Sequence, residues 1–167
     1  IYNWGNSKDP ADRRKAYAKR RERARLKNFG FEKLERLKGN IGYLDLRFFH
    51  DPRYGGDTAV ASMQVLSSCD AIIIDLRKTP GGHSGMVRLL ISYFLEEETL
   101  LRTMVFKSGE ERQGWTLPYV PGSRMYEKGL YILTSDSTGS AAEAFSYFMK
   151  SNKRAVLVGE TTRGAAH

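Results

Sequence analysis

Hydrophobic and polar positions change their spacing several times along the chain, and most of the changes fall at turns. Nearly continuous apolar runs predict short strands at residues 41–46, 71–76, 130–134 and 155–158. Apolar residues recur at helical spacing over residues 59–66, 86–94 and 141–149. Because strands and helices alternate through the last two-thirds of the chain, the pattern predicts an α/β fold with a largely parallel sheet.

The remaining segments are less regular. Residues 102–107 and 113–119 predict two more strands, which a hairpin would pair, and residues 120–127 predict a loop. Apolar residues recur at every third position over residues 31–37, which does not decide between helix and strand. At the front, Asp9 and Pro10 are typical of a helix start. That helix should run to about Lys27 and stop near Gly30, exposed because its apolar residues are sparse.

Composition limits the class of protein. The 167 residues fit one ordinary domain with a real core, and the single cysteine, Cys69, excludes an internal disulfide. No apolar run approaches the ~18–20 residues that a membrane span needs. The chain opens without an initiator methionine or a signal peptide, so we expect a piece of a longer protein, which leaves its compartment open.

The net charge of +8 is concentrated at one end. Residues 1–40 hold 13 Lys and Arg against 5 Asp and Glu, whereas residues 41–167 hold 14 of each. A basic segment over residues 8–27 could bind nucleic acid or an anionic surface. Aromatic residues are not interleaved with the charges as a base-stacking platform requires. We therefore favour a solvated basic helix or a tether to a preceding domain, and nucleic acid is not an expected partner.

Two turns contain residues of the kinds that a catalytic site requires. The first, residues 74–82, follows a buried strand, opens a helix and contains Gly81 and Gly82. Glycines there allow positive φ angles and let backbone N–H groups face a cleft at a helix N-terminus, where negative charge is favoured. A tight strand–helix connection with no chemical role explains the same residues.

The second turn, residues 134–143, also lies between a strand and a helix. Ser140 stands between Gly139 and two alanines, so its hydroxyl is uncrowded and could act as a nucleophile, with the N–H of Ala141 helping to bind an oxyanion. Alternatively Ser140 is an ordinary N-cap, with Glu143 completing a capping box.

Other motifs are absent from the sequence. It contains no Walker loop, no HExxH and no paired cysteines, and His50, His83 and His167 lack metal-ligand spacing, so we expect no metal and no cofactor.

Four stretches together resemble the tail-specific (C-terminal-processing) serine peptidase family. They are residues 40–44, 74–82, 133–143 and 158–164, in matching order and spacing, and the likeness covers about residues 29–167. The branch that it most resembles includes the interphotoreceptor retinoid-binding protein and its bacterial relatives.

The resemblance implies a layered ClpP/crotonase-like β/α fold and a serine endopeptidase that hydrolyses polypeptides through an acyl-enzyme. Carried over by position, Ser140 is the nucleophile, and Gly81, Gly82 and Ala141 supply the oxyanion hole. The resemblance also suggests an extracytoplasmic location, periplasmic or secreted. It divides the chain into residues 1–28, a basic helical segment or linker from an upstream domain, and residues 29–167, a catalytic core truncated at its C-terminus.

The sequence departs from the family at the general base. Typical tail-specific proteases carry a lysine just after the T-x-G of the last stretch, where this chain has Ala165. The base must then be another group. Relatives of the tricorn type use a histidine from a preceding segment, and His167 is the candidate within the chain. Glu160 is a candidate orienting or substrate-binding carboxylate, and His83 is a weaker candidate base.

Two further points follow from the resemblance. The stretch between Leu46 and Ala71 is too short for a PDZ-like insert, so tail recognition by such a module is not expected within the chain. The missing lysine also leaves an alternative open, a non-catalytic module that binds an apolar ligand or peptide as the retinoid-binding relatives do. The sequence gives no information on the oligomeric state.

Overall fold

A computed structural model describes residues 9–166 of the chain. The helices are α1 (Pro10–Arg25), the short 3₁₀ helix η1 (Asn28–Gly30), α2 (Pro52–Leu66), α3 (Ser84–Ser92) and α4 (Ala141–Ser151). The strands are β1 (Phe31–Leu37), β2 (Ile41–Leu46), β3 (Ala71–Asp75), β4 (Leu100–Val105), β5 (Glu111–Trp115), β6 (Gly129–Thr134) and β7 (Val156–Gly159).

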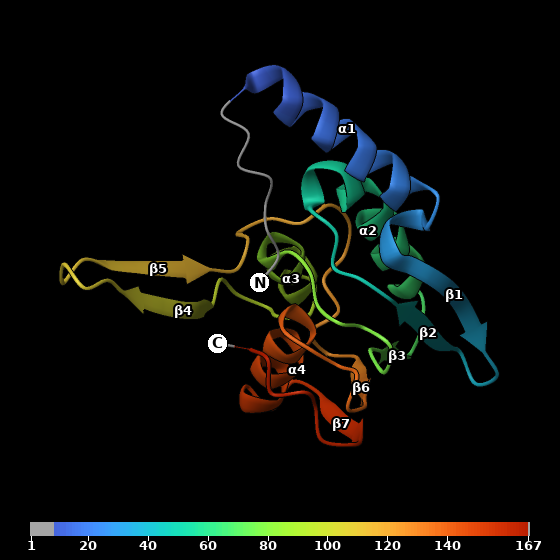
Figure 1. The fold of residues 1–167 in the computed structure, drawn as a ribbon. Coiled ribbons are helices and arrows are strands. Elements are labelled where there is room, and N and C mark those ends of the chain that lie inside the picture. Colours follow the sequence, from blue (N-terminus) through green and yellow to red (C-terminus); the bar gives the residue numbers. More distant parts are fainter. Residues whose placement is uncertain (1–8, 167) are drawn as a thin grey trace.

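The central sheet has the strand order β1-β2-β3-β6-β7 (Figure 1). Strands β2, β3, β6 and β7 are parallel, whereas β1 pairs with β2 in the antiparallel direction. The predicted α/β class with a largely parallel sheet is therefore confirmed.

One face of the sheet forms the core. Leu44, Ile74 and Ile132 lie side by side in register on three neighbouring strands and are fully buried. They share a single apolar cluster with residues of α2, α3 and α4. On the opposite face Tyr131 is 43% exposed, so burial alternates along β6, as expected of a strand with one solvated face.

Several element boundaries differ from the sequence prediction. The undecided segment 31–37 is a strand, because it pairs with β2 and inserts Phe31 into the core. Helix α2 begins at Pro52 rather than near residue 59, because the Asp51 carboxylate caps it by accepting a hydrogen bond from the Arg53 N–H at 2.9 Å. Helix α1 ends two residues earlier than expected.

The two strands expected over residues 102–119 do pair, and each begins and ends slightly earlier than predicted. They form the β4–β5 hairpin, a separate two-stranded sheet that projects from the body (Figure 1).

Helix α1 is exposed along nearly its whole length, as its composition predicts. Only Ala24 is buried, and the Tyr17 ring meets the Tyr54 ring of α2 edge-on, with centroids 5.5 Å apart. Among residues 9–166, no helix is both long and apolar enough to cross a membrane. The separate-domain origin expected for residues 1–28 stays a prediction.

Candidate active site

The turns that follow β3 and β6 lie side by side, because these strands are parallel neighbours in the sheet. Three hydrogen bonds join them. The Gly139 N–H donates to the Thr79 carbonyl at 3.0 Å, and the Thr138 hydroxyl donates to the Leu76 carbonyl at 2.8 Å. The Ser135 hydroxyl donates to the Arg77 carbonyl at 2.5 Å. The two turns singled out from the sequence therefore form one unit.

Ser140 occupies a strained position at the start of α4. Its φ angle is +49°, a left-handed conformation that a residue with a side chain rarely adopts. It is the N-cap residue of the helix, and it is exposed. Strained backbone of this kind at a strand–helix turn projects a side chain into a cleft and is common at functional sites.

The Pro80–Gly82 turn packs directly against Ser140. The φ angle of Gly81 is +129°, and a β-carbon there would lie 2.8 Å from the Cβ of Ser140 and 3.2 Å from the backbone nitrogen of Ala141. Only glycine allows an approach this close. Gly81 is therefore required by its contact with Ser140 as well as by its own backbone conformation.

The neighbouring Gly82 directs its N–H away from Phe49. The Phe49 N–H donates to the Gly81 carbonyl at 3.0 Å, and the Phe49 carbonyl accepts from the His83 N–H at 2.6 Å. Because amide groups of an extended segment alternate in direction, the N–H of Gly82 points to the other side.

Within residues 9–166, neither the Gly82 N–H nor the Ala141 N–H donates a hydrogen bond to an acceptor in the loops and turns. Both residues line one cleft, of about 610 Å³, together with Ser140. Ala141 is the first residue of α4, so its N–H lies at the positive end of the helix dipole. Backbone donors beside a serine hydroxyl can stabilise the negative oxygen of a tetrahedral intermediate.

A buried carboxylate, Glu143, holds the chain's last described segment against Ser140. One Glu143 oxygen accepts hydrogen bonds from the N–H of Ser140 at 2.7 Å and of Ala165 at 2.8 Å, and the other accepts from the N–H of Gly164 at 2.5 Å. Burial alone would raise the pKa of Glu143, but hydrogen bonds from the Thr162 side chain and these N–H groups outweigh it, so the pKa lies below its usual value.

Ala165 therefore lies next to the serine. Its backbone nitrogen and that of Ser140 bind the same Glu143 oxygen, at 2.8 and 2.7 Å, so the two nitrogens are no more than 5.5 Å apart. Ala165 also lines the cleft. The position at which the family resemblance implies a lysine is thus close to the Ser140 side chain, and this chain has a methyl group there.

The other candidate residues are placed differently. His83 caps α3: its Nδ1 accepts from the Gly85 N–H at 3.0 Å, and its Nε2 lies 3.7 Å from the Asp51 carboxylate. Glu160 is exposed, and its backbone pairs with Thr134. Neither residue lines the cleft, and His167 lies outside the described residues. Within residues 9–166, no three His, Cys, Asp or Glu side chains could hold a metal ion.

The β4–β5 hairpin forms a wall of the cleft that the sequence did not predict. Arg88 of α3 donates hydrogen bonds to the carbonyls of Trp115 at 2.5 Å and Thr116 at 3.2 Å, which fixes the hairpin base beside α3. The apolar part of the lining comes from both sides and includes Val87, Ile91, Leu101, Trp115 and Phe148. The strand pattern gave no signal for this role, because the contact depends on tertiary structure.

Comparison with known proteins identifies the family of the chain. The sequence model of peptidase family S41 matches residues 40–167. The chain is 28% identical over 144 residues to a carboxyl-terminal-processing protease of Picosynechococcus, covering 80% of this chain and 31% of that protein. It is 24% identical over 130 residues to a carboxy-terminal processing protease of Bacillus subtilis, covering 78% of this chain and 27% of that protein.

A solved structure shares the fold. The photosystem II D1 C-terminal processing protease superposes with a TM-score of 0.62 at 22% identity, over 75% of this chain and 31% of that one. The chain therefore spans about a third of the length of these relatives.

Proposed function

Since the chain belongs to peptidase family S41, we propose that it is the part of a serine-type peptidase that contains the nucleophile, Ser140. The observation that supports this most is the packing of the Gly81–Gly82 turn against Ser140 at the N-terminus of α4. A polypeptide is the proposed substrate. The apolar part of the cleft lining suits an apolar side chain next to the bond that is cut.

The proposed reaction runs through two steps. The Ser140 oxygen attacks the carbonyl carbon of the peptide bond while a base removes the hydroxyl proton, and the N–H groups of Ala141 and of the Gly81–Gly82 turn bind the oxyanion. The tetrahedral intermediate collapses to an acyl-enzyme as the base gives its proton to the departing amine. Water then attacks the ester in the same way and releases the carboxylic acid, regenerating the Ser140 hydroxyl.

The proposed base is a group other than lysine. The side chains that share the cleft with Ser140 within residues 9–166 include no histidine and no lysine. His167 follows the cleft-lining Ala166 directly in the sequence and is the candidate within this chain. We keep Glu160 as the candidate that orients the base or contacts substrate. His83 is less suitable, because its Nδ1 already accepts a hydrogen bond.

The alternative function, a non-catalytic module for an apolar ligand, is not favoured. The relatives named above are proteases by name. The strained serine lies beside the Gly82 and Ala141 N–H groups, which have no acceptor among the loops and turns of residues 9–166, and this arrangement suits catalysis better than packing of an apolar molecule.

Cleavage of an unfolded polypeptide by the full-length protein tests the proposal. We expect Ser140→Ala to abolish cleavage. The matched control is Ser137→Ala, which removes an exposed hydroxyl from the same turn. That hydroxyl donates a hydrogen bond to Asp136 at 3.2 Å, and its loss should leave the cleavage rate unchanged. Undiminished turnover by the Ser140→Ala variant would exclude the proposed nucleophile.

A further inference from the structure

A second, larger hollow lies between α1 and the turns at the ends of β2 and β3. This groove has a volume of about 1060 Å³, which exceeds most small-molecule sites. Five positively charged side chains line it, contributed by α1 and the turn after it, by the residue after β2 and by the turn after β3: Arg20, Arg23, Lys27, Arg47 and Lys78. We call it the basic groove.

The basic groove has an excess of positive charge. Glu32 is the carboxylate that lines it. Arg47 forms a salt bridge with Asp45 at 2.5 Å, but the salt bridges among residues 9–166 include none with Arg23, Lys27 or Lys78, and all three are exposed. Cations that face one another across a groove repel each other unless an anion lies between them.

The basic groove ends at the proposed oxyanion turn. Pro80 lines the groove, and a β-carbon at Gly139 would lie 3.1 Å from the Pro80 carbonyl oxygen. On the other side of the same turn, Gly82 lines the cleft that contains Ser140. The groove and the cleft are thus lined by residues two positions apart in the same Pro80–Gly82 turn.

We propose that the basic groove binds an acidic, extended segment of a polypeptide. That this segment belongs to the polypeptide cut at Ser140 rests on the proposed function, whereas the binding itself does not. The groove offers charges for carboxylates and apolar surface between them, from Phe48, Tyr54 and Pro80. Such a mixture suits a chain that alternates acidic and apolar side chains.

Two features disfavour a nucleic acid in the groove. The Glu32 carboxylate would lie close to the regularly spaced phosphates. The aromatic rings there also contact one another: the His50 ring centroid is 4.6 Å from that of Phe48 and 6.1 Å from that of Tyr54. Rings packed together in this way present less free surface for stacking of bases than a platform requires.

Binding to peptide probes tests the proposal without any need for catalysis. The probes are fluorescein-labelled decapeptides of alternating Glu and Ser and, as the uncharged match, of alternating Gln and Ser. Their affinities for the Ser140→Ala form of the full-length protein are measured by fluorescence anisotropy at low salt. We expect the acidic probe to bind at least about tenfold more tightly than the uncharged probe, because two ion pairs between probe and groove contribute a free energy of that size.

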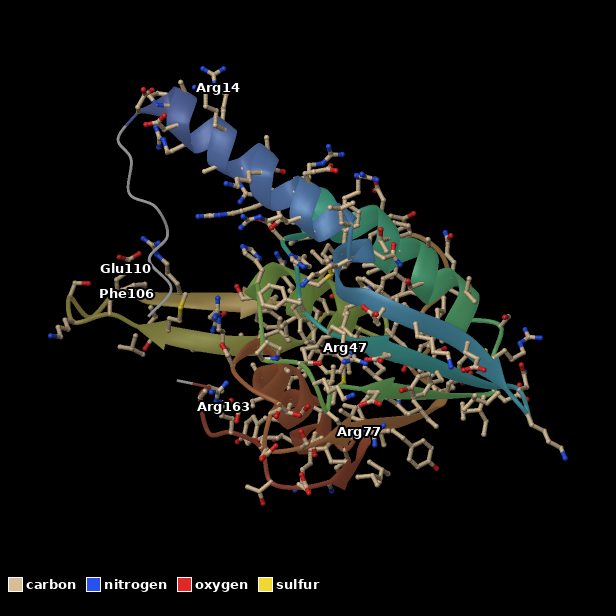
Figure 2. The ribbon with its side chains drawn as sticks, turned by 45° about the vertical axis from the view of Figure 1, so that its right-hand side comes forward. Arg14, Arg47, Arg77, Phe106, Glu110 and Arg163 are labelled. Carbon is tan, nitrogen blue, oxygen red and sulfur yellow. The ribbon has the colours of Figure 1, made fainter. Side chains whose placement is uncertain are left out.

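The charge variants locate the binding. Arg23→Glu with Lys27→Glu reverses two charges that line the groove, one in α1 and one just after it. Arg14→Glu with Lys15→Glu reverses two charges of α1 that do not line the groove. Figure 2 shows Arg14 near the far end of α1, away from Arg47. Lys78→Glu tests the groove from a different turn. The acidic probe should bind about tenfold more weakly to both groove variants and nearly as well to the control.

Each other outcome overturns the proposal. Equal weakening by the groove and control variants would indicate a diffuse attraction to α1. Equal binding of the acidic and uncharged probes would show that charge is not recognised, and tighter groove binding of a single-stranded oligonucleotide of the same charge would identify a different partner. Cleavage of an uncharged polypeptide by the wild-type protein tests the proposed function separately, so failure of one proposal is distinguishable from failure of the other.

Discussion

Replacing Gly81 with alanine should reduce the reactivity of Ser140 by moving the Pro80–Gly82 turn, the proposed oxyanion hole, away from it. The new β-carbon would lie 2.8 Å from the Ser140 Cβ and 3.0 Å from the Gly139 carbonyl oxygen. Carbon atoms in ordinary contact are ~3.5–4.0 Å apart, so the turn and the serine must separate by roughly 1 Å. A displacement of that size can lower the rate about 100-fold, and the loss of one oxyanion donor lowers it by about 100- to 1,000-fold.

The same substitution should reduce the free energy of unfolding. Gly81 has a φ angle of +129°, which alanine adopts only with strain of about 1–3 kcal/mol, and overpacking adds a similar amount. Gly109→Ala is the matched control, because its φ angle is +82° and no atom lies within 4 Å of the added carbon. It should show about 1–2 kcal/mol of backbone strain and no packing loss.

The assay for this prediction combines urea unfolding with the rate at which a serine-directed phosphonylating reagent modifies the full-length protein. Gly81→Ala should react about 100-fold more slowly while it remains folded by circular dichroism, whereas Gly109→Ala should react at the wild-type rate. A folded Gly81→Ala variant that reacts within about threefold of wild type would refute the claim that this turn serves Ser140.

Two further predictions concern the segment held by Glu143. Glu143→Gln replaces one carboxylate oxygen with an NH₂ group, which leaves at least one N–H of Ser140, Gly164 or Ala165 facing a donor. The free energy of unfolding at pH 7 should therefore fall by about 1–3 kcal/mol in urea denaturation. Because the folded pKa of Glu143 is lowered, its carboxylate stabilises the fold above the unfolded pKa, and this stabilisation is lost as pH falls through the folded pKa. The free energies of unfolding of wild type and variant should therefore converge below about pH 4. A difference that stays constant with pH would contradict the assignment of the stabilisation to the Glu143 carboxylate. Ala165→Lys should place an amine beside Ser140 and increase the rate of phosphonylation of the 167-residue chain about 10- to 100-fold, with a rate that rises at alkaline pH. The control Ala165→Met has a side chain of similar length without the amine and should not increase the rate. Equal rates for the two variants would show that a side chain at position 165 does not reach the Ser140 hydroxyl.

Much of the fold was predictable because the strands are short, apolar and separated by glycine or proline turns. The spacing around Ile72, Ile74 and Ile132 required strands, and alternation with helices required a mainly parallel sheet. The secondary structure of residues 31–37 could not be predicted, because an apolar residue at every third position fits a strand or a helix equally. Its pairing with β2 decides the matter, and this pairing is not visible in the segment itself.

The candidate site was predictable in part for a different reason. Ser140 and the Gly81–Gly82 turn stand out locally, and the parallel neighbours β3 and β6 bring them together. Glu143 was identified only as half of a capping box, because its bonds to Gly164 and Ala165 join residues more than twenty positions apart. The basic groove was not predicted either, because its lining residues are far apart in the sequence and the pattern of α1 alone indicates a solvated helix.

The proposed role of Ser140 as the nucleophile is tested most directly by finding the atom that an acylating or phosphonylating reagent modifies in the full-length protein. We expect mass spectrometry of the digested protein to locate one adduct on Ser140, and we expect neither the urea-unfolded protein nor the Ser140→Ala variant to acquire it. An adduct on another serine, or cleavage of polypeptides that continues with Ser140 unmodified under saturating reagent, would show that Ser140 is not the nucleophile.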